Sequence, residues 1–399
     1  MCACKDTRVA APASLSHTRR GRPAQPSRRL LVISHPAVVS VNQEVYRELR
    51  GRGWELTLVV PSSWRNEYRR ERFPPQPLTG MEDALKPVPV ALRGRVQRHL
   101  YLVSTRLLCA RVRPQVAFVE AEPFALAAAQ WGRAFARLGV PFGVQCYENI
   151  DRALPWPVRR LRSRVLRDAA FVAARSQTAA QLARAWGAAG EVELAPPAVS
   201  ESIAAGAQRE RAAAERPFTV GYAGRLTESK GLLDLLAAVR LLAAPVQLVL
   251  IGNGELRAQL EGQALPGSRV RVVDDLTHAQ MARGYAQLDV LAMPSRTTPA
   301  WKEQFGRAIV EALACGVPVV GSDSGEIPWL ISLTGGGLVF AEGDVRELAA
   351  QLGRLRAQPQ LRAELAARGR EAVERMFSVA AACDPLERML IGAAERSRR

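Results

Sequence analysis

Short apolar runs alternate with helical patterns along most of the chain, and this alternation limits the possible folds more than any other feature. The runs that read as strands are 29–35, 55–61, 115–121, 141–148, 169–175 and 191–196, followed by 218–224, 246–252, 270–274, 289–294, 317–322 and 337–342. Strands that alternate with helices form βαβ units and therefore mostly parallel sheets. The sequence predicts an α/β protein whose strands fall into two series.

A stretch rich in proline, glycine and charge separates the two series and reads as a linker. The expected parts are a disordered basic tail at 1–28, an N-terminal domain at 29–196, a linker at 197–217, a C-terminal domain at 218–377 and a C-terminal helix at 378–399. The tail is polar and has no apolar stretch behind its charged start, so a secretory signal is not expected. Each domain is expected to be doubly wound and to bind ligands at the carboxyl ends of its strands.

Composition excludes several classes of protein. The chain has 399 residues, 48% of them hydrophobic, which is enough for two domains with full cores. No run of about eighteen apolar residues is present, so no transmembrane helix is expected. The six cysteines have no C-x-x-C spacing. That pattern favours free thiols in a cytoplasmic protein over disulfides or a metal site.

Nearly all of the net charge of +17 belongs to the first half of the chain. Residues 1–200 contain 31 Lys and Arg against 15 Asp and Glu, whereas residues 201–399 contain 24 against 23. A basic half is compatible with nucleic acid, anionic lipid or an anionic substrate, and also with an arginine-rich composition alone. Amphipathic basic helices are predicted over 92–114 and 156–170; such helices lie on anionic membranes or simply face solvent. No nucleic-acid-binding module is found.

The first strand of the second series ends in a loop suited to a phosphate-bearing ligand. Gly221 and Gly224 lie at the strand exit, and Arg225 and Lys230 follow before a helix begins. Close backbone approach, a helix N-terminus and two cations are what a diphosphate requires, although the same charges can be ordinary solvated ones. Asn253 lies between two glycines in the next such turn, which by itself is a weak signal.

Two glutamates eight positions apart flank the start of another predicted helix. Apolar spacing predicts the helix over 305–315, with Gly316 at its C-terminus and a buried strand after it. Glu303 precedes the helix, and Glu311 lies about two turns inside it. Both carboxylates can therefore face one cleft. The alternative is that Glu303 is favoured only by the helix dipole and that Glu311 is a surface residue.

Taken together, three stretches resemble a known family. GYAGRLTESKG (221–231), LVLIGNGE (248–255) and EQFGRAIVEALACGVPVVGSDSGEIP (303–328) resemble family 4 of the retaining glycosyltransferases, in which Glu303 and Glu311 match the Glu-x7-Glu signature. The resemblance is close over the C-terminal half and looser before it. It implies the GT-B fold: two facing, doubly wound Rossmann-like domains, with the C-terminal helix crossing back to the N-terminal domain.

The resemblance also implies a function and a set of residues. The expected enzyme is a metal-independent, retaining hexosyltransferase-like protein of polysaccharide or glycolipid biosynthesis, which uses a nucleotide diphosphate sugar as donor and needs no cofactor. Its acceptor would be a glycan, a lipid-linked sugar or a small molecule. The matching catalytic residues are Arg225 and Lys230, which stabilise the leaving diphosphate, and Glu303, which binds the transferred sugar. The matching donor-binding residues are Gly224, Asn253, Gln304, Phe305, Gly306, Arg307 and Glu311, the last of these holding the ribose.

The acceptor side agrees less with the family. Its glycine-rich first loop and its histidine after a middle strand are replaced here by SHPAVVSVN (34–42) and VQCYENIDR (144–152). His35, Asn42 and Glu148 are the predicted acceptor-side residues, because they follow strands that end at the expected cleft. An alternative reading is a GT-B enzyme that does not transfer the sugar, such as a nucleotide-sugar epimerase. The sequence specifies neither the base nor the sugar of the donor.

Overall fold

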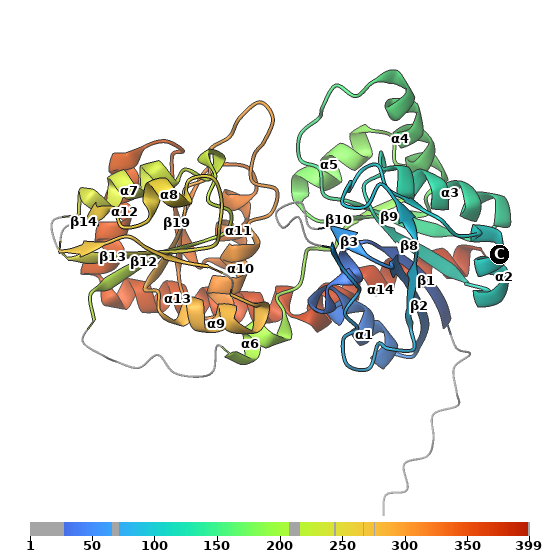
Figure 1. The fold of residues 1–399 in the computed structure, drawn as a ribbon, viewed down its shortest axis with the longest axis horizontal. Helices are drawn as coiled ribbons and strands as arrows, with labels where there is room; N and C mark the ends of the chain where they lie inside the picture. The colour runs from blue at the N-terminus through green and yellow to red at the C-terminus, as the bar shows by residue number, and fades with distance from the viewer. Residues whose placement is uncertain are drawn as a thin grey trace, which may run out of the picture.

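The computed structural model describes residues 28–397 except 66–71, 207–215, 243–244, 266 and 275. The tail expected at 1–28 therefore lies, apart from Arg28, outside the described residues. The described chain forms two α/β domains that lie side by side (Figure 1). Each of the twelve predicted strands is present in one of two parallel sheets.

The N-terminal sheet has seven strands in the order β11-β10-β9-β8-β1-β2-β5. Their bounds are β1 (Arg28–Ser34), β2 (Trp54–Pro61), β5 (Leu85–Val88), β8 (Val116–Glu120), β9 (Phe142–Cys146), β10 (Phe171–Ala174) and β11 (Glu191–Leu194). Central strands are apolar along their whole length because both faces of a parallel sheet are covered. Val32, for example, pairs with Leu58 on one side and Phe118 on the other, and all three are fully buried.

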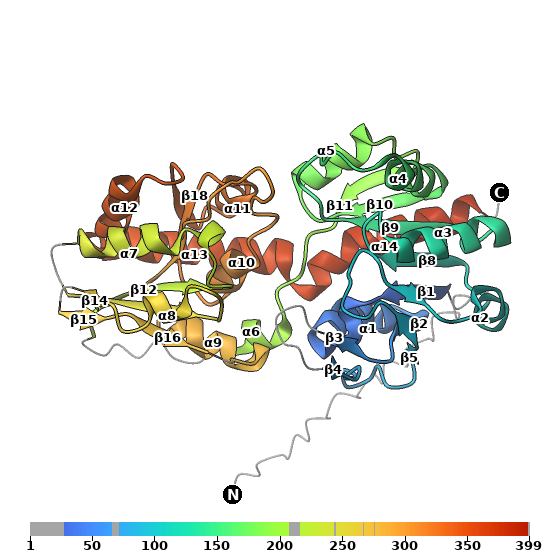
Figure 2. The same ribbon diagram turned by 45° about the horizontal axis from the view of Figure 1, so that its top comes forward.

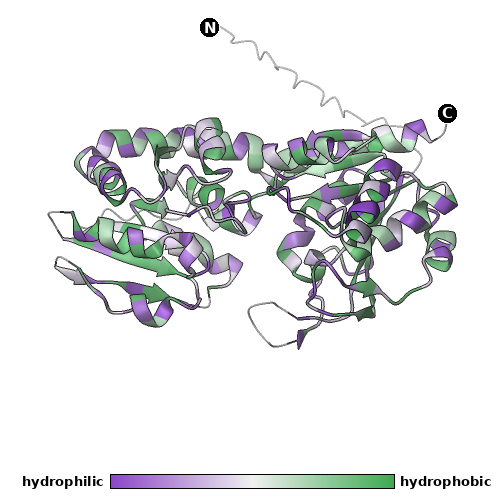
Figure 3. Cartoon of the chain, turned by 90° about the horizontal axis from the view of Figure 1, so that it is seen from above, coloured by the Kyte–Doolittle hydropathy of each residue, from purple (hydrophilic) through white to green (hydrophobic). Residues whose placement is uncertain are grey.

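Helices and small hairpins complete this domain. The helices are α1 (Glu44–Gly51), α2 (Thr105–Val112), α3 (Leu126–Leu138), α4 (Trp156–Asp168) and α5 (Gln177–Ala185). Two hairpins pair β3 (Trp64–Arg65) with β4 (Arg72–Phe73) and β6 (Val90–Ala91) with β7 (Leu100–Tyr101). Figure 3 shows the apolar strands enclosed by helices that carry polar residues.

The C-terminal sheet has six strands in the order β16-β13-β12-β17-β18-β19. Their bounds are β12 (Phe218–Ala223), β13 (Val246–Ile251), β16 (Arg271–Val273), β17 (Val290–Met293), β18 (Val319–Ser322) and β19 (Gly337–Phe340). The helices are α7 (Leu232–Arg240), α8 (Arg257–Leu260), α9 (His278–Ala286), α10 (Arg307–Ala314), α11 (Ile327–Thr334), α12 (Val345–Ala357) and α13 (Pro359–Phe377). The sequential order of strands reverses beside β12, the kind of position where doubly wound sheets bind ligands.

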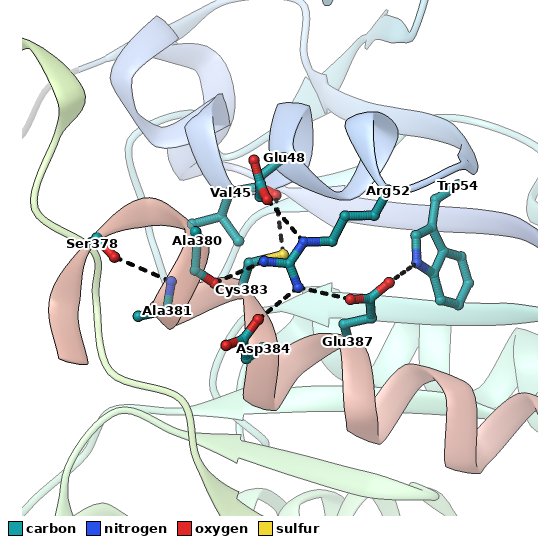
Figure 4. A network of polar contacts seen from close by, with 10 residues as sticks. All are labelled: Val45, Glu48, Arg52, Trp54, Ser378, Ala380, Ala381, Cys383, Asp384 and Glu387. Atoms are coloured by element: carbon teal, nitrogen blue, oxygen red, sulfur yellow. Dashed lines mark hydrogen bonds and ion pairs between the residues drawn. The ribbon is translucent and has the colours of Figure 1, made fainter. Parts of the chain in front are cut away.

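The C-terminal helix α14 (Val379–Arg396) crosses from the C-terminal domain to the N-terminal domain, as expected (Figure 2). Its buried face, including Leu386 and Met389, belongs to the N-terminal core. Figure 4 shows how Arg52 fixes it: the guanidinium donates to Asp384 at 2.7 Å, to Glu387 at 2.8 Å and to the carbonyl of Ala380 at 3.0 Å. The helix is therefore an integral part of the N-terminal domain.

Two segments differ from the sequence-based expectation. Residues expected as linker include helix α6 (Glu201–Gly206), in which Ile203 is buried in the C-terminal core. The basic helix predicted over 92–114 is wrong in its first half, because only α2 is helical there. Leu92 and Gly94 have φ angles of 54° and 81°, in the left-handed region that a right-handed helix excludes. The second basic helix is present as α4.

Candidate active site

Two adjoining cavities lie at the carboxyl ends of the two sheets. The larger, of about 850 Å³, lies against the C-terminal domain, and the smaller, of about 410 Å³, lies between the domains. Their walls share His278, Arg307 and Glu311. We refer to them as the donor cavity and the acceptor cavity, following the roles that the sequence predicts.

Glycine turns shape one wall of the donor cavity. Gly224 and Gly252 have φ angles of +146° and +140°, and a Cβ at Gly252 would lie 2.0 Å from the carbonyl oxygen of Gly224. Only glycine permits this close approach of two loops. The amide of Asn253 donates to Asp274 at 3.1 Å. Gly224, Arg225 and Asn253 all line the donor cavity.

Lys230 and Glu303, which are 73 positions apart in the sequence, form a buried ion pair. Lys230 Nζ lies 2.7 Å from Glu303 Oε2, and Ser295 Oγ donates to the same oxygen at 2.9 Å. Their exposed fractions are 8% and 7%. Burial lowers the pKa of Lys230, although the charge of Glu303 opposes that shift. Neither residue is among the described residues that line the two cavities, so in this structure they face each other.

The loop that carries Glu303 is held from both domains. Within the C-terminal domain, the ring of Trp301 lies 4.3 Å from Lys230 Nζ. From the N-terminal domain, Asn149 Nδ2 donates to the carbonyl of Glu303 at 2.9 Å, and Arg152 donates to that of Ala300 at 2.8 Å. The position of Glu303 therefore depends on how the two domains meet.

Glu311 lies on helix α10 and lines both cavities. The hydroxyl of Tyr285, in α9, donates to Glu311 Oε2 at 2.8 Å, and Tyr285 is fully buried. Burial raises the pKa of Glu311, while Arg307 and this hydrogen bond oppose the shift. Sequence reasoning missed Tyr285, because an aromatic residue in an amphipathic helix gives no sign of a partner 26 positions away.

The remaining predicted donor residues lie at the start of α10. Gln304 lines the acceptor cavity, and Arg307 lines both. Gly306 is the N-cap with φ +76°, which suits glycine. The ring of Phe305 is buried against Trp329 and Phe377, so this residue can reach a ligand only through its backbone. Amide groups of a helical first turn lack intrahelical partners and favour anions.

The predicted acceptor-side residues His35, Asn42 and Glu148 all line the acceptor cavity. Burial lowers the pKa of His35 to about 3, so the imidazole is neutral at physiological pH. The amide of Asn42 donates to the carbonyl of Pro36 at 2.8 Å. Sequence reasoning did not assign Glu120, Glu122 and Arg175, which also line this cavity. The signal that could have found them is that each is polar and lies at or just after the end of a buried strand.

Several negative findings apply to the described part of the chain. No group of three or more His, Cys, Asp or Glu side chains is arranged to hold a metal ion there. None of its helices combines the length and apolar character that crossing a bilayer requires. Cys109, Cys146, Cys315 and Cys383 are buried free thiols.

Comparison with known proteins identifies the C-terminal domain. Residues 217–358 match the family model described as Glycosyl transferases group 1. The amylovoran biosynthesis glycosyltransferase AmsK of Erwinia amylovora is 34% identical over 152 residues, 36% of this chain and 37% of that protein. A GDP-mannose-dependent monoacylated alpha-(1-6)-phosphatidylinositol monomannoside mannosyltransferase of Corynebacterium glutamicum is 35% identical over 160 residues, 39% of this chain and 42% of its own length.

A D-inositol 3-phosphate glycosyltransferase of Xylanimonas cellulosilytica is 33% identical over 189 residues, 45% of this chain and 44% of its own length. The chain thus matches less than half of the length of each of these three relatives.

Comparison with solved structures shows that the similarity in fold covers both domains. Sucrose-phosphate synthase from Thermosynechococcus elongatus has a TM-score of 0.65 at 19% identity, and Anabaena HepE, solved in complex with UDP, has 0.66 at 17%. Each match covers 92% of this chain and 100% of the other. At such low identity the likeness establishes the fold alone. The chain therefore has the two-domain GT-B fold, and residues 217–358 within it are similar to the glycosyl transferases group 1 family.

Proposed function

We propose that the protein is a retaining glycosyltransferase that moves a hexose-type sugar from a nucleotide diphosphate sugar to a hydroxyl of a glycan, lipid-linked or small-molecule acceptor. One observation carries the proposal: Gly224, Arg225, Asn253, Arg307 and Glu311 line a single cavity of about 850 Å³ in the matched domain. Two relatives, a glycosyltransferase of amylovoran biosynthesis and a phosphatidylinositol monomannoside mannosyltransferase, support it.

The charges around the donor cavity suit departure of a diphosphate. Arg225 and Lys230 would balance the charge that develops on the leaving group, and the N-terminus of α10 would add to this stabilisation. Glu311, which can accept two hydrogen bonds, would hold the ribose hydroxyls. Glu303 accepts from Lys230 and Ser295 through Oε2. That leaves Oε1 for a hydroxyl of the transferred sugar.

A screen of donor nucleotides tests the proposal directly. Thermal unfolding of the full chain is measured with UDP, GDP and ADP and with their glucose and mannose conjugates. Stabilisation by one base, lost in Glu311→Ala, supports the donor cavity. No stabilisation by any of them would contradict the assignment. Conversion of the bound sugar without any acceptor would instead favour the epimerase.

We further propose that the enzyme associates with an anionic membrane surface on its cytoplasmic face. Leu102, Leu107 and Trp156 are 60%, 72% and 62% exposed on the N-terminal domain. Arginines such as Arg106 and Arg160 lie beside them in the sequence. Exposed apolar side chains among cations are typical of surfaces that contact anionic lipid.

We expect activity to be independent of divalent metal. The proposed diphosphate site has Arg225 and Lys230, and the described residues there form no carboxylate cluster that could hold an ion. Transfer rates should therefore be unchanged after dialysis against EDTA, measured as release of nucleoside diphosphate. Loss of activity that magnesium restores would contradict the expectation.

We expect the new bond to keep the α configuration of the donor. Inversion requires a general base opposite the leaving group, whereas here the cations and helix N-terminus are on the leaving-group side. A leaving-group oxygen would then take the acceptor proton on the same face. The anomeric proton coupling of the purified product reports the outcome. With a gluco-configured donor, a large trans-diaxial coupling would show inversion and refute the mechanism.

A further inference from the structure

We infer that the acceptor cavity receives an uncharged, hydroxyl-bearing group, such as an unphosphorylated sugar or cyclitol ring, and that Glu122 binds one of its hydroxyls. This inference rests on the proposed glycosyl transfer and narrows only the acceptor. It separates two kinds of acceptor, a ring that carries a free phosphate group, as the name of one relative implies, and a ring that does not.

The walls of the acceptor cavity carry more acidic than basic side chains. Five glutamates and two arginines line it: Glu44, Glu120, Glu122, Glu148 and Glu311, with Arg175 and Arg307. Burial lowers the pKa of both histidines in the walls, His35 and His278, which favours their neutral forms. Even without Glu122, whose carboxyl group is mostly protonated near pH 7, four glutamates face two arginines. A phosphate entering this space would therefore meet more negative than positive charge, which like-charge repulsion disfavours.

Both arginines already have other partners or other predicted roles. Arg175 donates to Gln145 at 2.8 Å, to the carbonyl of Ala195 at 2.9 Å and to Glu120 at 3.1 Å. Each of its three guanidinium nitrogens thus donates one hydrogen bond within the protein. Arg307 lines the donor cavity as well, where it is one of the predicted donor-binding residues. Among the described arginines of residues 28–200, Arg175 alone lines this cavity.

Most of the glutamates in the cavity wall also accept hydrogen bonds from other groups of the protein. Glu120 accepts from Ser34 and Tyr46, both at 2.6 Å, in addition to Arg175. Glu148 accepts from two backbone amides and from Arg152. Such fully bonded carboxylates shape the cavity and stay in place when a ligand enters.

Glu122 differs from these glutamates, because one of its two carboxyl oxygens accepts no hydrogen bond from the protein. It is 8% exposed, and its Oε1 accepts from the amide of Tyr147 at 2.7 Å. Its Oε2 is buried and has no partner at hydrogen-bonding geometry among the described residues, although the Glu148 amide and the weakly donating Cys146 thiol lie close to the carboxyl group. Leaving a buried polar atom unsatisfied costs free energy, which a ligand hydroxyl would recover. Because Glu122 belongs to the cavity wall, an acceptor is placed to supply that hydroxyl.

The protonation state of Glu122 fits a neutral ligand. Burial, with a contribution from the charge of Glu148, raises its pKa to about 8, against the hydrogen bond from Tyr147. The buried thiol of Cys146 is its other titratable neighbour and is itself neutral, since burial raises the pKa of that thiol. Near pH 7 the carboxyl group is therefore mostly protonated. A carboxylic acid can both donate to and accept from a hydroxyl.

Matched probe pairs test the inference on the full chain. Binding of myo-inositol and D-inositol 3-phosphate, and of methyl α-D-mannoside and mannose 6-phosphate, is measured by saturation-transfer NMR with UDP or GDP present. We expect the neutral member of each pair to bind at least about tenfold more tightly. Glu122→Leu should weaken neutral-probe binding by about tenfold, the scale of one buried hydrogen bond. Glu122→Gln, which keeps hydrogen-bonding groups, should retain most of it.

Glu364→Leu, on the exposed face of α13, is the control and should leave binding unchanged. Equal or tighter binding of the phosphorylated probes would overturn the inference, as would unchanged binding by Glu122→Leu or no binding of either neutral probe. The comparison within the parent protein stands even if the leucine variant does not fold. Nucleotide binding in the donor cavity is recorded for every sample, so failure of this inference is distinguishable from failure of the proposed function.

Discussion

Replacement of Lys230 by alanine is expected to reduce turnover by on the order of 10²–10³, the usual cost of removing one group that stabilises developing charge. Lys230 is a buried cation whose amine lies 2.7 Å from Glu303, and it is one of the two cations predicted to stabilise the leaving group. The substitution also leaves Glu303 buried without its partner, which typically costs about 3–5 kcal/mol of folding free energy. Release of nucleoside diphosphate and the melting temperature should therefore both fall.

Two companion variants separate the causes. Lys302→Ala removes a lysine one residue before Glu303 that makes no ion pair among the described residues, and it should behave like the parent. Lys230→Arg keeps the charge and should retain more turnover than the alanine variant. Near-parental transfer by Lys230→Ala, measured below its melting temperature, would be incompatible with the proposed role.

Replacement of Glu311 by alanine is expected to weaken binding of the cognate nucleoside diphosphate by about 10–100-fold, because charge-assisted hydrogen bonds contribute about 1.5–3 kcal/mol. Tyr285→Phe should have the same kind of effect at a smaller size, since Tyr285 only orients the carboxylate through its 2.8 Å hydrogen bond. Isothermal titration with UDP or GDP measures both.

Deoxy nucleotides show whether the ribose is the group that Glu311 holds. Removal of the 2′- or 3′-hydroxyl should weaken binding to the parent protein and have little further effect on Glu311→Ala. A glutamate that served only to stabilise α10 would give equal losses with ribose and deoxyribose nucleotides. That result would remove Glu311 from the donor site while leaving the fold assignment intact.

Most of the fold was predictable because its strands are buried on both faces and therefore read as continuous apolar runs. Strand β5 was missed because Lys86 and Pro87 interrupt such a run, and an edge strand tolerates both. The false helix over 92–104 arose from apolar residues at helical spacing. His99 there packs instead against the rings of His35, Trp64 and Tyr101, contacts that no local pattern encodes.

The candidate site was predictable where a motif spans it and, for His35, Asn42 and Glu148, where a residue follows a strand that ends at the cleft. Glu303, Lys230 and Glu311 were found through the stretches that resemble a family, and the structure pairs the first two. Tyr285 and Glu122 were not found, because their importance comes from burial and from neighbours brought together by folding. A sequence pattern reports residue type and spacing, but not whether an oxygen atom is left without a partner.

The two places where the chain passes between domains lie side by side, since the amide of Val199 donates to the carbonyl of Phe377 at 2.7 Å. The first passage leads to α6 and the second from α13 into α14. Two neighbouring connections would act as one hinge. Such a hinge permits rotation of one domain relative to the other about a single axis and resists other relative movements of the domains. Rotation that opens the cleft between the domains would then separate Asn149 from the Glu303 loop, while the hydrogen bond between Val199 and Phe377 at the hinge is kept. Substrate entry and the geometry around Glu303 would thus share a single degree of freedom.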